Sequence, residues 1–432
     1  MPVSLSATLA VNEAIAQRRR SGLPVLPLGF GEAGLPVHPV LREALSRGAG
    51  MNTYGPVAGT WELREAAAGY WERRGIPADP ALTLAGPGSK PLLYGMLLAL
   101  GGDAAIAAPS WVSYAAQTCL AGQRPLPVPA APEHGGVPQP DLLAAAVTDA
   151  RNRGREVRSV IVTVPDNPTG TLAGPETLRL LAETARELDL VIVSDEIYRD
   201  LVYDPRAEVH SPAEFAPERT VVSTGVSKNL ALGGWRLGTV RLPDSDTGRR
   251  LWRGLLGVAS EIWSSPAAPV QQAAAYAYTE PEEITEHIAR SRRLHGIVAE
   301  AVTERFRSAG ARVAQPQAGF YLYPDFAGMR SHLTAELGVG TGSELTSHLL
   351  EQYGMGVLPA QEFGEDPHAL RMRVATSQLY GETEEQRYAA LHAETPTELP
   401  WVRAHLDRLE EVLGEVTRLW REDRGMADAQ AG

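Results

Sequence analysis

The chain has 432 residues, of which 44% are hydrophobic and 21% charged, and it carries a formal net charge of −12 at pH 7. This composition excludes a disordered chain, and the acidic balance argues against a protein that binds nucleic acid or an anionic membrane. The single cysteine, Cys119, can form neither an internal disulfide nor a zinc cluster. Neither a signal peptide nor an apolar run near the ~20 residues that span a bilayer is recognisable, so we expect a cytoplasmic protein.

Strands and helices are predicted to alternate through the middle of the chain. Most of the six predicted strands are continuous apolar runs without polar alternation, which are typical of strands that are buried on both faces of a parallel sheet. The predicted strands are 82–84, 104–107, 159–164, 190–193, 220–223 and 237–241, and predicted helices lie at 91–100, 111–120 and 175–188. We therefore predict an α/β fold with a mostly parallel sheet flanked by helices.

The C-terminal part of the chain predicts a second, mixed region. Its predicted elements are a helix at 282–309, a strand at 318–323, a helix at 343–353, a strand at 370–375 and a last helix at 399–421. Proline and glycine punctuate the N-terminal segment, which we expect to pack against this region. We therefore predict a large α/β domain over residues 50–285 and a smaller α+β domain from residues 1–49 and 286–432.

Two lysines stand out among the basic residues. The 40 basic residues are 38 arginines and two lysines, Lys90 and Lys228. Arginine neither forms a Schiff base nor loses its proton in proteins, whereas lysine can do both. A biased base composition with two chance survivors would give the same count, so the surroundings of the two lysines must decide.

Two glycine-rich stretches are candidates for a phosphate-binding loop. Residues 29–34 match the G-x-G-x-x-G pattern, but two prolines follow and exclude the helix that a dinucleotide site needs. Gly88, Ser89 and Lys90 lie between a predicted strand and an apolar helix, whose positive end can bind phosphate. A plain turn between strand and helix is the alternative here.

Polar side chains follow three further predicted strands. Asn167, then Asp195 with Tyr198, and then Lys228 come shortly after a strand, and Arg236 follows Lys228. Ligands of such sheets bind beyond the carboxyl ends of the strands, so we expect these side chains to converge. A reactive amine, a phosphate cradle and a carboxylate for a ring nitrogen are what pyridoxal 5′-phosphate requires.

The sequence at these positions resembles a known family. Residues 167–170 read NPTG, residues 194–198 read SDEIY, and Ser227-Lys228 is followed by Gly234 and Arg236. This combination is similar to that of the class I/II aminotransferases of the aspartate aminotransferase group, over about residues 25–378. The resemblance implies the type I fold of transferases that depend on pyridoxal 5′-phosphate, and a homodimer.

The resemblance also implies roles for individual residues at the cofactor. Lys228 would carry the Schiff base and act as the general base at the substrate Cα, and Arg236 would bind the phosphate. Asp195 would hold the ring nitrogen protonated, while Asn167 and Tyr198 would hydrogen-bond the ring 3-hydroxyl. The remaining expected cofactor contacts are Gly88, Ser89 and Lys90 at the phosphate, Trp111 stacked on the ring, and Thr224 or Ser227 in place of a serine that some relatives carry at position 225.

Around the substrate, the resemblance implies further contacts. Gly31 would present its backbone N–H to the substrate carboxylate, Arg371 would clamp that carboxylate, and Tyr54 would reach the phosphate of the neighbouring subunit. Arg373 departs from the family, which usually has a small residue there. It lies on the same side of the strand as Arg371, so it is either a second contact to an anionic substrate or paired with an acid.

The activity implied by the resemblance is transfer of an amino group from an L-amino acid to a 2-oxo acid. Residues 379–400 are an insertion that either lines the pocket or forms a surface loop. A related enzyme that eliminates, replaces, cyclises or oxidises an amino acid shares the same motifs and remains an alternative. A ligand-sensing module of the same fold is the other alternative, although no basic recognition helix precedes the matched region.

Overall fold

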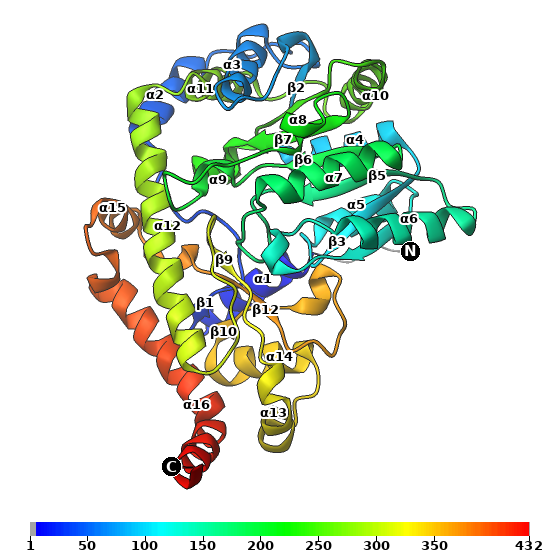
Figure 1. Ribbon diagram of the computed structural model, residues 1–432. Coiled ribbons are helices and arrows are strands. Elements are labelled where there is room, and N and C mark those ends of the chain that lie inside the picture. Colours follow the sequence, from blue (N-terminus) through cyan, green and yellow to red (C-terminus); the bar gives the residue numbers. More distant parts are fainter. Residues whose placement is uncertain (1–5, 432) are drawn as a thin grey trace.

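A seven-stranded sheet with helices on both faces forms the larger part of the protein (Figure 1). The computed structural model describes residues 6–431, apart from the side chains of residue 419 and residues 421–431. The strand order is β2-β8-β7-β6-β5-β3-β4, and all neighbours pair in parallel except β8, which is antiparallel to both β2 and β7. The strands are β2 (Thr83–Gly86), β3 (Asp103–Ala108), β4 (Pro125–Pro129), β5 (Val157–Thr163), β6 (Val191–Asp195), β7 (Thr220–Gly225) and β8 (Gly238–Arg241).

The six predicted strands are all present, with shifts of at most two residues at their ends. The prediction missed β4, because its three prolines are untypical of a strand. This strand lies at the edge of the sheet, where one side needs no hydrogen-bonding partner and proline is tolerated. The helices of this part are α2 (Pro39–Gly48), α3 (Trp61–Glu72), α4 (Ser89–Leu100), α5 (Ser113–Leu120), α6 (Pro140–Asn152), α7 (Pro175–Glu187), α8 (Pro212–Phe215), α9 (Val226–Asn229), α10 (Asp246–Ile262) and α11 (Ala268–Tyr278).

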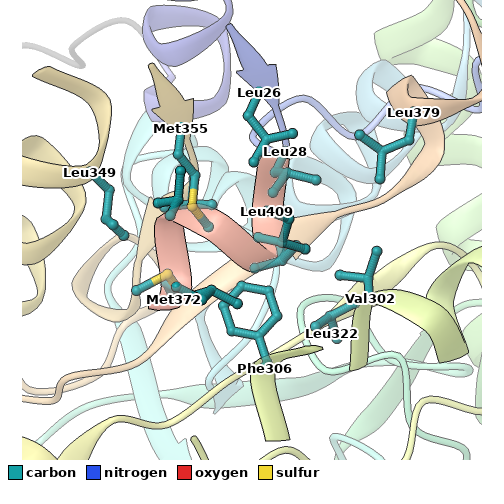
Figure 2. Packing of buried hydrophobic residues seen from close by; sticks show 14 of the residues in the cluster. Leu26, Leu28, Val302, Phe306, Leu322, Leu349, Met355, Met372, Leu379 and Leu409 are labelled. Carbon is teal, nitrogen blue, oxygen red and sulfur yellow. The ribbon is translucent and has the colours of Figure 1, made fainter. Parts of the chain in front are cut away.

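The smaller part combines both ends of the chain around one hydrophobic core. Its strands form two small sheets, in the orders β1-β10 and β11-β12-β9. Leu26 and Leu28 from the N-terminal segment pack with Met355, Met372 and Leu409 from the C-terminal part (Figure 2). The elements are α1 (Ala7–Arg20), β1 (Leu26–Pro27), β9 (Tyr321–Leu322), α13 (Arg330–Leu337), α14 (Gly342–Tyr353), β10 (Met355–Gly356), β11 (Leu358–Pro359), β12 (Met372–Ala375), α15 (Glu384–His392) and α16 (Pro400–Ala431).

The long helix α12 (Glu282–Ser308) joins the two parts (Figure 1). Its first turns belong to a core with α3 and α11, where Ile284 is buried, whereas Phe306 near its end is buried in the core of the smaller part. Leu41 of α2 also packs in the first of these cores. The larger part therefore includes α2, which precedes residue 50, because α2 packs against α11.

The insertion at residues 379–400 does not line the cavity at Lys228, and it is not a plain surface loop. It folds into α15 and two short 3-10 helices, and it packs against α12. Ala390 and Leu391 are buried in the core of the smaller part. None of the helices between residues 6 and 431 is long and apolar enough to cross a lipid bilayer.

Candidate functional site

A cavity of about 460 Å³ lies at the carboxyl ends of the parallel strands. Thr163 and Asp195 end β5 and β6 and line it, and Lys228 lines it from α9, directly after β7. The smaller part contributes Arg373 and Tyr321 to the opposite wall. The motifs that were expected to converge at this edge of the sheet are thus found in one cavity. Its lining residues include Gly31, Ser89, Lys90, Trp111, Asn167, Asp195, Tyr198, Ser227, Lys228, Arg236 and Arg373 from the predicted set.

Lys228 is presented by a single helical turn. Gly225 ends β7, and α9 begins at the next residue, so the lysine is fixed directly at the end of a buried strand. Its Nζ donates a hydrogen bond to the carbonyl oxygen of Gly31 at 2.5 Å. A Cβ on Gly31 would lie 2.0 Å from the hydroxyl oxygen of Tyr321, so this close approach requires glycine.

Asp195 is a buried carboxylate with one oxygen free for a ligand. Its Oδ2 accepts a hydrogen bond from the hydroxyl of Tyr114 at 2.9 Å. Its Oδ1 is buried and has no partner among the described residues. Burial raises the pKa of Asp195 to about 6, although the hydrogen bond from Tyr114 lowers it. A buried carboxylate oxygen without a donor is costly, so this atom fits a ligand that carries an N–H.

One end of the cavity is strongly cationic. Gly88 caps the N-terminus of α4 with a φ of 97°, and a Cβ there would lie 2.3 Å from Nη2 of Arg236. Ser89 and Lys90 follow in the first turn of this helix and line the cavity with Arg236. Burial, followed by the charges of Arg236 and Lys228, lowers the pKa of Lys90. Two cationic side chains at a helix N-terminus, Lys90 and Arg236, fit a phosphate dianion.

Aromatic side chains form the remaining walls. Trp111 lies edge-to-face with Tyr114 at 5.2 Å between ring centroids, and Nζ of Lys90 is 5.0 Å from the Trp111 ring. The Tyr198 hydroxyl is 3.0 Å from that of Tyr321. Burial, and then the neighbouring Tyr321, raises the pKa of Tyr198 above its usual value. Its hydroxyl therefore keeps its proton near neutral pH and can donate to a ligand.

The structure does not bring Arg371 into this cavity. Its guanidinium pairs with Glu365 at 2.5 Å and with Asp325 at 3.2 Å, and it lines a different cavity beside β3 and β4. The two acids are nearly buried, whereas the side chain of Arg371 is 41% exposed. The expected position of Arg371 at the substrate carboxylate is therefore not found, because two carboxylates already take up its guanidinium.

Arg373 occupies the cavity instead. It is 1% exposed, and it donates to the carbonyl oxygen of Gly29 at 2.9 Å and to Oδ1 of Asn167 at 3.3 Å. None of the carboxylates that the structure describes pairs with it, and its Nε is buried without a partner. Of the two possibilities open for Arg373, pairing with an acid is thus excluded within the described residues, and contact with an anionic ligand remains.

Besides Arg371, three predicted residues lie outside the lining of the cavity. Thr224 is buried within β7 opposite Thr239, Gly88 is the N-cap residue directly before Ser89, and Tyr54 is 91% exposed on the surface. Ten lining residues were not among the predicted site residues, and Tyr114 and Tyr321 are two of them. The spacing of Tyr114, three residues after Trp111 on the approach to a helix, is a signal that could have found it. No comparable signal marks Tyr321.

The chain is similar to known proteins over most of its length. The family model described as aminotransferase class I and II matches residues 24–382. A probable aspartate/prephenate aminotransferase of Thermus aquaticus is 32% identical over 86% of this chain and 93% of that relative. An aspartate aminotransferase of Geobacillus stearothermophilus is 32% identical over 86% of this chain and 92% of that relative.

Solved structures agree with the sequence comparisons. The aspartate aminotransferase of Thermus thermophilus with maleate has a TM-score of 0.80 and 28% sequence identity, covering 95% of this chain and 97% of that chain. This likeness extends to the mostly parallel seven-stranded sheet and its flanking helices, which is the type I fold expected from the sequence. On the match of the family model and of these relatives, the chain belongs to the class I and II aminotransferases and is an aminotransferase.

Proposed function

We propose that this aminotransferase works with pyridoxal 5′-phosphate bound in the cavity at Lys228. The observation that carries the proposal is the buried, unpartnered Oδ1 of Asp195 in the same cavity as a lysine amine and a cationic helix N-terminus. The three features match the ring nitrogen, the aldehyde and the phosphate of this cofactor. When bound, the cofactor acts as an electron sink that stabilises negative charge at the substrate Cα.

The residues present fit each part of the cofactor. Lys228 would bind the aldehyde carbon, and Asp195 would accept the N–H of the protonated ring nitrogen. Ser89, Ser227, Lys90 and Arg236 line the cationic end and would hold the phosphate. Asn167 and Tyr198 would donate to the 3-oxygen, and Trp111 would stack on the ring. Thr224, which lies behind this wall, is not needed for these contacts.

We assign the substrate α-carboxylate to Arg373 in place of Arg371. The guanidinium of Arg373 lacks an acidic partner, and its fork geometry suits a carboxylate. The amine of Lys228 would act as the general base that removes the proton from the substrate Cα, and the resulting ammonium would then donate that proton to the bound cofactor. The carbonyl of Gly31 already accepts from Lys228 and so orients that amine, while its N–H would meet the substrate carboxylate.

The proposal includes a homodimer in which Tyr54 of each subunit reaches the phosphate of the other. Tyr54 is 91% exposed and lies beside Met51 and Pro266, which line a shallow surface hollow with it. Met51, Trp61 and Ile262 are further large apolar side chains exposed on the surface. Exposed apolar residues of this kind are typical of an interface with another protein copy.

A screen of amino donors with the purified protein tests the function. Aspartate is the first donor to try, because relatives are named for it, and a 2-oxo acid serves as acceptor. Transamination predicts conversion of the cofactor to its amine form, one 2-oxo acid released for each cofactor, and a new amino acid from the acceptor. Lys228→Ala is the control that should show none of these.

The same screen separates the alternative reactions. An enzyme that eliminates, cyclises or oxidises its amino acid would consume the donor without forming an amino acid from the acceptor. That result across all donors would refute transamination by this chain while leaving the cofactor site in place.

A further inference from the structure

Tyr321 lies in the cavity wall formed by the smaller part. It belongs to β9, is 2% exposed, and pairs with Ala375 of β12, the strand that also carries Arg373. Its side chain meets both the residues that would hold the cofactor and the residue that would hold the substrate. The hydroxyl and the ring face make these contacts separately.

The hydroxyl of Tyr321 links Tyr198 with Gly31. It is 3.0 Å from the hydroxyl of Tyr198 and 3.5 Å from the carbonyl oxygen of Gly31, which also accepts from Lys228. Each tyrosine has one hydroxyl proton. When Tyr198 donates its proton to a ligand, it can only accept from Tyr321, whose single proton then points to Tyr198 and no longer to the carbonyl oxygen of Gly31. A hydrogen bond donated to Tyr198 makes that hydroxyl a stronger donor in turn.

The ring of Tyr321 supports the guanidinium of Arg373. The Cζ atom of Arg373 lies 4.7 Å from the centroid of this ring and 5.1 Å from that of Phe363. A buried guanidinium without a paired carboxylate needs other stabilisation, and the negative face of an aromatic ring supplies it. Unlike a carboxylate, a ring leaves the N–H groups of Arg373 free for an incoming anion.

We propose that Tyr321 is a positioning residue with two separable roles: its ring holds Arg373 ready for the substrate carboxylate, and its hydroxyl strengthens the hydrogen bond from Tyr198 to the cofactor. The inference rests on the proposed function, because it takes Arg373 and Tyr198 as the substrate and cofactor contacts. Removal of the Tyr321 hydroxyl should therefore change the pH midpoint of the lysine-bound cofactor, whereas removal of the ring should change the KM for the substrate.

Two substitutions and a matched control test these roles. Tyr321→Phe keeps the ring and removes the hydroxyl, whereas Tyr321→Leu removes both. Tyr323→Phe is the control, because Tyr323 is a similarly buried tyrosine two residues away whose hydroxyl donates to Glu365 at 2.6 Å, outside the cavity. For each protein we measure the pH midpoint at which the absorbance of the lysine-bound cofactor changes. We also measure the KM and kcat for the amino donor.

Tyr321→Phe should raise the pH midpoint by about 0.5 to 1 unit. Without the Tyr321 hydroxyl, Tyr198 is a weaker donor to the 3-oxygen and stabilises the deprotonated form of the lysine-bound cofactor less. The KM of this variant should stay within about threefold of wild type, since the ring face remains. Tyr321→Leu should raise KM by about tenfold or more through loss of the support for Arg373. Tyr323→Phe should match wild type in both measurements.

An unchanged midpoint in Tyr321→Phe, or an equal shift in Tyr323→Phe, would overturn the inference. A KM within threefold of wild type in a folded Tyr321→Leu protein would do the same. If Tyr321→Leu fails to fold, the midpoint and KM of Tyr321→Phe decide alone. Wild-type protein that transfers no amino group would instead refute the proposed function, so the two failures are distinguishable.

Discussion

Arg373 lies on β12 and Arg371 lies directly before it. Substitution of each arginine in turn tests which guanidinium binds the substrate carboxylate. Arg373→Lys and Arg371→Lys are the matched changes, because each keeps the charge and removes the planar fork. A lysine at position 373 can make one of the two charge-assisted hydrogen bonds that an arginine makes to a carboxylate. A hydrogen bond to a charged group contributes about 1.5 to 3 kcal/mol, which is about a 10- to 150-fold loss of kcat/KM.

Arg371→Lys should change kcat/KM by less than about threefold, because Asp325 and Glu365 hold Arg371 outside the cavity. The Arg371→Lys substitution should instead lower the stability of the protein. Both acids are nearly buried and would each lose part of a partner, so the free energy of unfolding should drop by about 1 to 2 kcal/mol.

Steady-state kinetics with the donor varied at saturating acceptor, and urea unfolding followed by tryptophan fluorescence, measure the two effects. A large loss of kcat/KM in Arg371→Lys together with near wild-type kinetics in Arg373→Lys would refute the reassignment. That outcome would show that the guanidinium of Arg371 leaves its two acids when substrate binds.

Further substitutions probe the other side chains of the cavity. Lys228→Arg should abolish transamination, and borohydride should no longer fix the cofactor to the protein, because a guanidinium does not condense with an aldehyde. Asp195→Ala should weaken cofactor binding by about 10- to 150-fold in a titration followed by absorbance, since one charged hydrogen bond is lost. Burial raises the pKa of Asp195 to about 6 in the protein without cofactor, and the charged form accepts the ring N–H, so the affinity for the cofactor should fall as pH drops through this value. Tyr114→Phe removes a donor to that carboxylate, so the pH below which cofactor affinity falls should rise; a pH that stays in place would contradict this. Gly31→Ala should lower kcat/KM more than tenfold, because the new Cβ would lie 2.0 Å from the Tyr321 hydroxyl oxygen, and Tyr321→Phe in the same chain should restore part of the loss.

The sequence predicts six of the seven strands of the large sheet and misses one of its two edge strands, β4. Continuous apolar runs mark the six strands that are buried on both faces, because such strands need no polar alternation. The edge strand β4 escapes prediction because Pro125, Pro127 and Pro129 are signals against a strand, and only its position in the sheet makes them acceptable. The local sequence of a strand does not show which strands pair with it, so the position of β4 at the edge of the sheet could not be predicted.

The candidate site shows the same division between local and distant information. Asn167, Asp195 and Lys228 follow predicted strands, and strand ends meet at one edge of a parallel sheet, so their convergence could be predicted. The choice between Arg371 and Arg373 could not. Both lie on one side of the strand, and the decision depends on acids at positions 325 and 365, which the fold brings to Arg371 alone.

Both lysines of this arginine-rich chain line the same cavity, although most of the surface cations are arginine. For Lys228 the reason is chemical, because only an amine can take up an aldehyde. For Lys90 the reason is local: its ammonium lies near the Trp111 ring and shares the cationic end of the cavity with Arg236. An ammonium is a compact point charge that can approach the proposed phosphate beside Arg236, whereas a guanidinium is suited to a planar pair of acceptors. The net charge of −12 therefore describes the outer surface, and the cavity has the opposite sign, which suits a cofactor and a substrate that are both anions.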